Sequence, residues 1–178
     1  MRIITLILFF LIFASANDLH ANQPISGGKF KNWETFTFNG GKGKICFAQT
    51  KPVKRSPNSF KRGESRLFVS FRPNENIRDE VSVTSGHEYK SSSVSAKSGK
   101  NNFSFFSQDK FAWLLDEREE QKFIKVMKRA TNLMVKGNST KGTQSTDHYS
   151  MMGFTKAYNL AKKIVVDEKN CISLLRWS

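Results

Sequence analysis

The sequence predicts a mainly β domain with two helices, arranged as an antiparallel β-sandwich or barrel-like domain. Three observations predict this class: short segments in which apolar and polar residues alternate, turn signals at about every tenth residue, and two segments with apolar residues at helical spacing. Strands of this kind bury one face, so we expect the two helices to pack on the sheet.

Alternation is clearest in residues 30–38. One phase of this segment contains Phe36 and the other contains Trp33, and the pattern leaves open which face is buried. The glycine-rich residues 39–41 predict a hairpin turn after this strand, and residues 98–100 predict a second hairpin. We also expect strands at residues 44–49, 67–71, 80–84, 91–97, 102–106 and 111–115.

The rest of the chain predicts a long loop, two helices and a further hairpin. Residues 50–64 contain two prolines and no periodicity, which indicates a long basic loop. Asp116 can cap a helix, because Glu119 three residues later completes a capping-box-like pattern. The strands of the hairpin are expected at residues 132–139 and 145–152, and the second helix at residues 154 to about 167.

The start of the chain predicts export. Arg2 precedes a mostly apolar run at residues 3–13, and Ala14-Ser15-Ala16 follows, which is typical of a signal peptide cleaved after Ala16. The run is too short to span a bilayer, although an uncleaved anchor is the alternative. We therefore expect a signal peptide at residues 1–16, a flexible N-terminal lead at 17–29 and a single domain at 30–178, without a transmembrane segment in the mature chain.

The two cysteines are Cys46 and Cys171. In an oxidising compartment such a pair predicts one disulfide bond, and two free buried thiols are the alternative. The cysteines are too far apart for a C-x-x-C motif, and no two of the three histidines have metal-ligand spacing. We expect no metal and no cofactor.

The charge is strongly basic, with 29 Lys and Arg against 15 Asp and Glu. For an exported protein this favours an anionic envelope polymer, lipid head groups or a protein as partner, and not nucleic acid. The basic residues are dense in residues 42–72, where the alternative is a solvated surface that keeps the protein soluble. The candidate anion-binding residues are Lys51, Lys54, Arg55, Lys61 and Arg62.

The predicted strand at residues 145–152 contains three residues of the types found in hydrolytic triads. His148 and Ser150 share one face of the strand, whereas Asp147 points to the other face and cannot orient the imidazole. We assign no catalytic residue and expect a non-enzymatic protein. The alternative is an envelope-polymer hydrolase that uses the His148/Ser150 surface.

Residues 33–171 resemble the invasion-associated locus B proteins of Gram-negative bacteria. The stretches that carry the resemblance are KICFAQTKP, VSFRPNENIRDEVSVTSG, FAWLLD and VKGNSTKGTQSTDHYSMMGFTKA. The resemblance implies a periplasmic or envelope-associated protein, linked to host-cell interaction in pathogenic relatives, and its two cysteines match Cys46 and Cys171. It supplies no catalytic residues. This chain departs from the pattern because its last helix is longer and ISLLRWS follows Cys171, so the resemblance gives no expectation for the packing of the C-terminus.

Overall fold

The computed structural model describes residues 23–174, with side chains described as far as residue 166. The expected signal peptide at residues 1–16, the first part of the lead and the tail after residue 174 lie outside these residues. The strands are β1 (Ile25–Phe30), β2 (Trp33–Gly40), β3 (Gly43–Thr50), β4 (Lys54–Ser56), β5 (Arg66–Arg72), β6 (Ile77–Thr84), β7 (Val94–Ser98), β8 (Asn101–Gln108), β9 (Phe111–Trp113), β10 (Asn132–Asn138) and β11 (Gln144–Ser150). The helices are α1 (Glu117–Arg129), α2 (Phe154–Leu174) and a short 3-10 helix (Pro73–Glu75).

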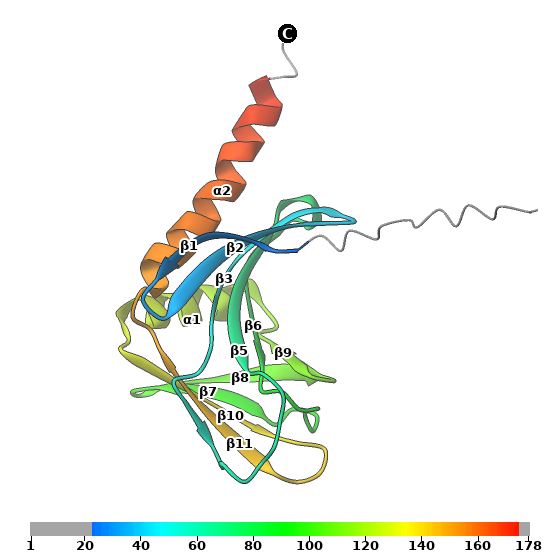
Figure 1. Cartoon of the computed structure of the whole chain (residues 1–178), viewed down its shortest axis with the longest axis vertical. Helices are drawn as coiled ribbons and strands as arrows, with labels where there is room; N and C mark the ends of the chain where they lie inside the picture. The colour runs from blue at the N-terminus through cyan, green and yellow to red at the C-terminus, as the bar shows by residue number, and fades with distance from the viewer. Residues whose placement is uncertain (1–22, 175–178) are drawn as a thin grey trace, which may run out of the picture.

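The strands form one open antiparallel sheet in the order β1-β2-β3-β5-β6-β9-β8-β7-β10-β11-β4. The sheet bends at β8, whose first residues pair with β7 and whose last residues pair with β9. We call β1, β2, β3, β5, β6 and β9 the upper half-sheet and β7, β10, β11 and β4 the lower half-sheet, as they lie in Figure 1. This arrangement confirms the predicted mainly β, sandwich-like fold with two helices.

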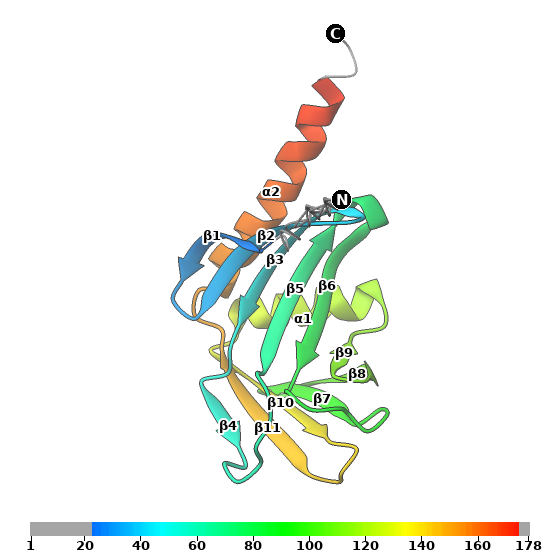
Figure 2. The ribbon, with the colours of Figure 1, turned by 45° about the vertical axis from the view of Figure 1, so that its right-hand side comes forward.

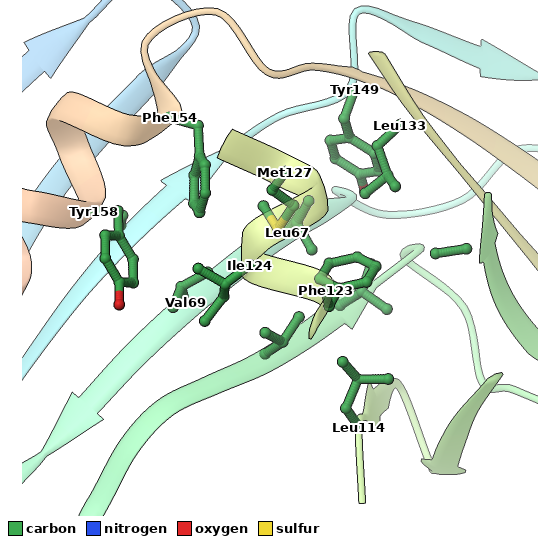
Figure 3. Packing of buried hydrophobic residues seen from close by; sticks show 14 of the residues in the cluster. Leu67, Val69, Leu114, Phe123, Ile124, Met127, Leu133, Tyr149, Phe154 and Tyr158 are labelled. Atoms are coloured by element: carbon green, nitrogen blue, oxygen red, sulfur yellow. The ribbon is translucent and has the colours of Figure 1, made fainter. Parts of the chain in front are cut away.

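Helix α1 fills the space between the inner faces of the two half-sheets. Its N-cap is the predicted one, because the Glu119 amide donates to the Asp116 carboxylate over 2.9 Å. The ring of Phe123 is fully buried and meets Phe103 and Phe105 of β8 edge-on, at centroid distances of 4.7 and 5.6 Å. Figure 3 shows Phe123 within the cluster of buried side chains that these elements share.

Helix α2 covers the inner face of the upper half-sheet. The Phe154 ring lies 4.8 Å from that of Trp33, and the Thr35 hydroxyl donates to the Ala157 carbonyl over 2.9 Å. The helix extends to Leu174, beyond the predicted end near residue 167, and the added turns contain neither glycine nor proline. Figure 2 shows α2 projecting past the end of the strands.

These contacts decide which face of residues 30–38 is buried. Trp33 and Thr35 are completely buried beneath α2, whereas Phe36 lies on the opposite face and is partly exposed. Since strand side chains alternate, the face that looks away from both helices also carries Phe38. We call this surface the outer face of the upper half-sheet.

Two short strands lie where the sequence predicts irregular chain. Residues 25–29 belong to the predicted flexible lead, but they form β1, which pairs with β2 and has a bulge between Ser26 and Gly28. The bulge accommodates the glycines that suggest a loose segment. Strand β4 lies inside the predicted loop at residues 50–64, where three residues pair with β11. Strand β1 forms a hairpin with the next strand, β2, and β4 pairs with a strand that is distant in the sequence, so pairing outweighs the local composition in both cases.

Candidate binding site

A cleft of about 570 Å³ opens on the outer face of the upper half-sheet, where β2 begins and β3 ends. Phe36 and Gln49 contribute to its lining from the sheet. Its basic lining residues are Lys29, Lys31, Lys51 and Arg66. Glu34 is the only carboxylate in this lining, and it accepts a 2.8 Å hydrogen bond from the Ser26 hydroxyl. The cleft therefore has a net positive charge.

Glu64 at the margin of the cleft neutralises only part of this charge. Its carboxylate accepts from Lys51 Nζ over 2.7 Å and from the Arg66 guanidinium, and these hydrogen bonds lower the pKa of Glu64 to about 2. Lys29 and Lys31 are exposed and form no ion pair within the described part of the chain. These two ammonium groups are consequently available to an external anion.

Three of the five predicted anion-binding residues lie on the surface. Lys51, Lys54 and Lys61 are exposed. Arg55 is half-buried, and one of its terminal nitrogens donates to the Gly63 carbonyl over 2.5 Å. The structure does not place Arg62 with the surface lysines, because its side chain is only 1% exposed.

Arg62 instead forms a buried ion pair with Asp147 of β11. Its two terminal nitrogens donate to the two carboxylate oxygens over 2.5 and 2.9 Å, and Asp147 is completely buried. Arg62 also donates to the Ser85 carbonyl and the Ser65 hydroxyl, both over 2.7 Å. The guanidinium thus donates to acceptors inside the protein. We assign Arg62 the role of anchoring the loop that follows β4, and we remove it from the anion-binding set.

A chain of polar side chains continues from this pair into the lower half-sheet. His87 Nε2 lies 2.8 Å from the Ser145 hydroxyl, and Tyr89 donates to the Ser85 hydroxyl over 2.7 Å. Burial lowers the pKa of His87 and raises the pKa of Tyr89. The fold therefore favours neutral forms of both side chains.

Tyr149 lies in the same interior, and its hydroxyl is buried without a hydrogen-bond partner among the described residues. Burial raises the pKa of Tyr149 well above its ordinary value. No local sequence signal indicates this polar network, since His87 and its partner Ser145 are 58 residues apart.

At the His148/Ser150 surface, Ser150 forms hydrogen bonds within the fold. As predicted, these two residues lie on the opposite face of β11 from Asp147. The Ser150 hydroxyl accepts from the Met152 amide over 3.3 Å, and the Ser150 carbonyl accepts from the Trp33 indole over 3.0 Å. Within the described part of the chain the His148 ring forms no hydrogen bond, so no third group orients it.

The predicted disulfide stays a prediction. Cys46 is completely buried on the face of β3 that α2 covers. Cys171 belongs to α2, but its side chain lies outside the described residues. Strand β3 and helix α2, which contain the two cysteines, pack against each other.

A second cleft, of about 780 Å³, lies between β6, β9 and the start of α1. Glu120 contributes to its lining and accepts from the Val81 amide over 3.1 Å. Burial raises the pKa of Glu120 to about 7, and the nearby carboxylates of Glu80 and Asp79 add to the effect. Across residues 23–166, no cluster of three or more His, Cys, Asp or Glu side chains could hold a metal ion.

The protein belongs to the class of mainly β proteins with an open, bent antiparallel sheet. One helix lies in the bend of this sheet, and a second helix packs on its first strands. The crystal structure of invasion associated protein B from Bartonella henselae is similar, with a TM-score of 0.53 and 13% sequence identity, over 79% of this chain and 97% of that chain. This likeness confirms, at the level of the fold, the resemblance predicted from the sequence. No protein-family model and no curated protein sequence matches the chain. Among the described residues, no helix is both long and apolar enough to cross a membrane.

Proposed function

We propose that the protein is an exported, non-enzymatic component of a bacterial envelope that binds an anionic partner through exposed lysines. Its fold is that of invasion associated protein B from Bartonella henselae, and the sequence begins with the pattern of a signal peptide. The signal-peptide pattern and the fold support export and envelope association. The charges around the cleft on the outer face support the binding role.

The observation that carries the proposal is the concentration of ammonium groups at this cleft. Lys29, Lys31 and Lys51 line it, and the acidic residues nearby are already engaged by Ser26 or by Lys51 and Arg66. Lys54 in β4 and Lys61 in the loop that follows it are also exposed. Each Lys close to an anionic surface contributes about 1 kcal/mol of attraction, and exposed charges are screened by salt.

The test is co-sedimentation with phosphatidylglycerol/phosphatidylcholine vesicles and with an acidic polysaccharide, at about 0.05 and 0.5 M salt. The cleft variant replaces Lys29, Lys31 and Lys51 with Gln. Its matched control replaces Lys97, Lys100 and Lys136, which are equally exposed but lie on the lower half-sheet and its turn, with Gln. Both variants lose three positive charges; they differ in position and in the ion pair of Lys51 with Glu64.

We expect wild-type protein to bind an anionic probe at low salt and to bind less at high salt. The cleft variant should lose at least ten-fold in affinity, whereas the control should lose at most three-fold. Equal losses of affinity in the two variants would mean that binding depends on the net charge of the protein and not on the cleft. Absence of binding to either probe at any salt would refute the proposal.

A further inference from the structure

The outer face of the upper half-sheet carries a group of aromatic side chains, although neither helix covers it. Phe36 and Phe47 are cross-strand partners whose rings stack at 5.4 Å, and Phe68 meets Phe47 edge-on at 6.2 Å. Phe38 and Ile45 form the next cross-strand pair on the same face. All five side chains are partly exposed. In Figure 2 the strands β3, β5 and β6 lie in front of α1, so this face is turned toward the viewer.

The apolar surface continues across the sheet to β9. Ser82 of β6 pairs with Phe68 on one side and with Trp113 on the other, which places both aromatic rings on one face. The rings of Trp113 and Phe111 stack at 6.0 Å, and Phe106 of β8 is the cross-strand partner of Trp113. Phe106 and Phe111 are 44% and 45% exposed. We call the set Phe36, Phe38, Ile45, Phe47, Phe68, Phe106, Phe111 and Trp113 the aromatic face.

Uncovered apolar patches of this extent mark interaction sites in soluble proteins. The outer face of an antiparallel sheet that meets only water normally carries polar side chains. The lower half-sheet follows that rule, since Ser95, Ser104 and Lys136 occupy its outer face. The aromatic face therefore requires an occupant.

Charge selects among the possible occupants, because the margin of the aromatic face is basic at the cleft, where Lys29, Lys31 and Lys51 border it. Two more lysines lie at its other margins: Lys42 in the β2–β3 turn, with its side chain 82% exposed and 4.0 Å from Glu75, and Lys110 in the β8–β9 turn, next to Asp109. A second copy of the chain would bring such margins together and repel. An anionic lipid surface would complement them, with phosphates at the lysines and acyl chains against the rings.

We propose that the aromatic face docks onto the interface of an anionic lipid bilayer, with the lysines at its margin bound to lipid phosphates. This inference rests on the proposed function and names its partner class as a lipid surface. It adds an apolar contact to the electrostatic one. Part of the binding should therefore resist salt, which charge attraction alone does not explain.

The first test compares vesicle binding by wild type and by the double variant Phe47→Thr/Phe68→Thr, which places β-favouring residues on the same strands. Vesicles contain equal amounts of phosphatidylglycerol and phosphatidylcholine, and pure phosphatidylcholine vesicles measure the part that needs no charge. The control is Ser95→Thr/Ser104→Thr on the outer face of the lower half-sheet. We expect the aromatic variant to lose at least ten-fold in affinity at high salt, and the control to match wild type.

A second test keeps the aromatic face intact, so it does not depend on the variant folding. Trp113 lies on the aromatic face, whereas Trp33 is fully buried. The third tryptophan of the chain is Trp177, so a Trp177→Phe background leaves these two as the fluorophores. In that background, lipids brominated in their acyl chains should quench the fluorescence of Trp113 on binding. Adding Trp113→Phe should remove the quenched component.

The outcomes separate the two proposals. Loss of binding by the aromatic variant together with quenching of Trp113 supports docking. If the lysine variant of the cleft loses binding while the aromatic variant retains it and Trp113 is not quenched, binding is electrostatic only; docking is overturned and the proposed function stands. If wild type binds the acidic polysaccharide but no vesicle, the lipid inference alone is overturned. A dimer detected by light scattering that Phe47→Thr/Phe68→Thr dissociates, without quenching of Trp113, assigns the face to a second copy and also overturns it.

Discussion

The two half-sheets distribute polarity in opposite ways. In the interior of the lower half-sheet, Asp147 and Arg62 form a buried ion pair beside His87, next to the apolar Leu133 and Val135. In the upper half-sheet Val69 and Val81 are buried inside, and the ring of Phe47 is partly exposed outside. The lower half thus buries an ion pair, whereas the upper half exposes aromatic rings.

This difference suggests that each half departs from the usual pattern for its own reason. The buried polar side chains of the lower half hold the loop after β4, which brings only a three-residue strand to the sheet edge. The apolar outer side chains of the upper half pack only against each other, and no described element lies over them. Buried polar side chains thus hold a loop in the lower half, and exposed aromatic side chains form the proposed docking surface of the upper half.

Breaking the buried ion pair should have the largest effect. In Asp147→Asn the guanidinium of Arg62 stays buried without a compensating charge, so we expect the free energy of unfolding to fall by about 3–5 kcal/mol. Urea denaturation followed by circular dichroism measures this loss. Lys136→Ala, on the exposed face of the neighbouring strand β10, should change stability by less than about 0.5 kcal/mol.

A double variant sharpens the interpretation of that loss. Arg62→Met/Asp147→Leu removes both charges and should be more stable than Asp147→Asn, because no unpaired ion remains. If Asp147→Asn lies within about 1 kcal/mol of wild type, the pair does not hold the loop in solution.

Helix α1 contains a buried carboxylate, Glu120, whose negative charge we expect to destabilise the fold. Among the described residues no cation pairs with Glu120, and burial raises its pKa to about 7 from an ordinary value of 4.5. The folded state therefore holds the Glu120 proton more tightly than the unfolded state, and stability is lost as the pH rises from 4.5 through about 7. Glu120→Gln keeps the acceptor for the Val81 amide and removes this loss. Since one side of the carboxyl group meets the cleft, we expect a gain of about 1–2 kcal/mol at pH 8 and little change at pH 4.

Thermal unfolding across this pH range checks the prediction. The control is Glu119→Gln on the same helix, because the Glu119 side chain is 41% exposed and pairs with Lys122. It should show no comparable dependence on pH. A Glu120→Gln variant that is less stable than wild type at pH 8 would mean that the charged form of Glu120 is the one that the fold prefers.

Local signals predicted most of the strands and the start of α1. The glycines at residues 39–41 indicated the turn between β2 and β3, and Asp116 with Glu119 indicated the helix cap, because both signals act within a few residues. The strands β1 and β4 were missed. Strand β1 forms a hairpin with β2 that its glycine-rich composition does not indicate, and β4 is stabilised by pairing with the distant strand β11.

The candidate site was predicted less well for the same physical reason. Arg62 and Asp147 are 85 residues apart, so nothing near Arg62 in the sequence distinguishes it from the surface lysines. The sequence did not predict the aromatic face, for a different reason. Both phases of residues 30–38 carry large aromatic rings, and only the position of α2 over Trp33 reveals that Phe36 faces outward.

The smallest effect should be the cost of the aromatic face to folding. Phe47 is only partly buried and packs against two other phenylalanines, so Phe47→Thr should lower the free energy of unfolding by about 1 kcal/mol or less. Phe123→Ala, inside the core, should cost about 3–5 kcal/mol. Urea denaturation of both variants measures the contrast. If Phe47→Thr costs as much as Phe123→Ala, the outer rings are required by the fold, and their exposure no longer argues for a lipid partner. A small cost combined with lost vesicle binding would show that these rings contribute to binding far more than to stability.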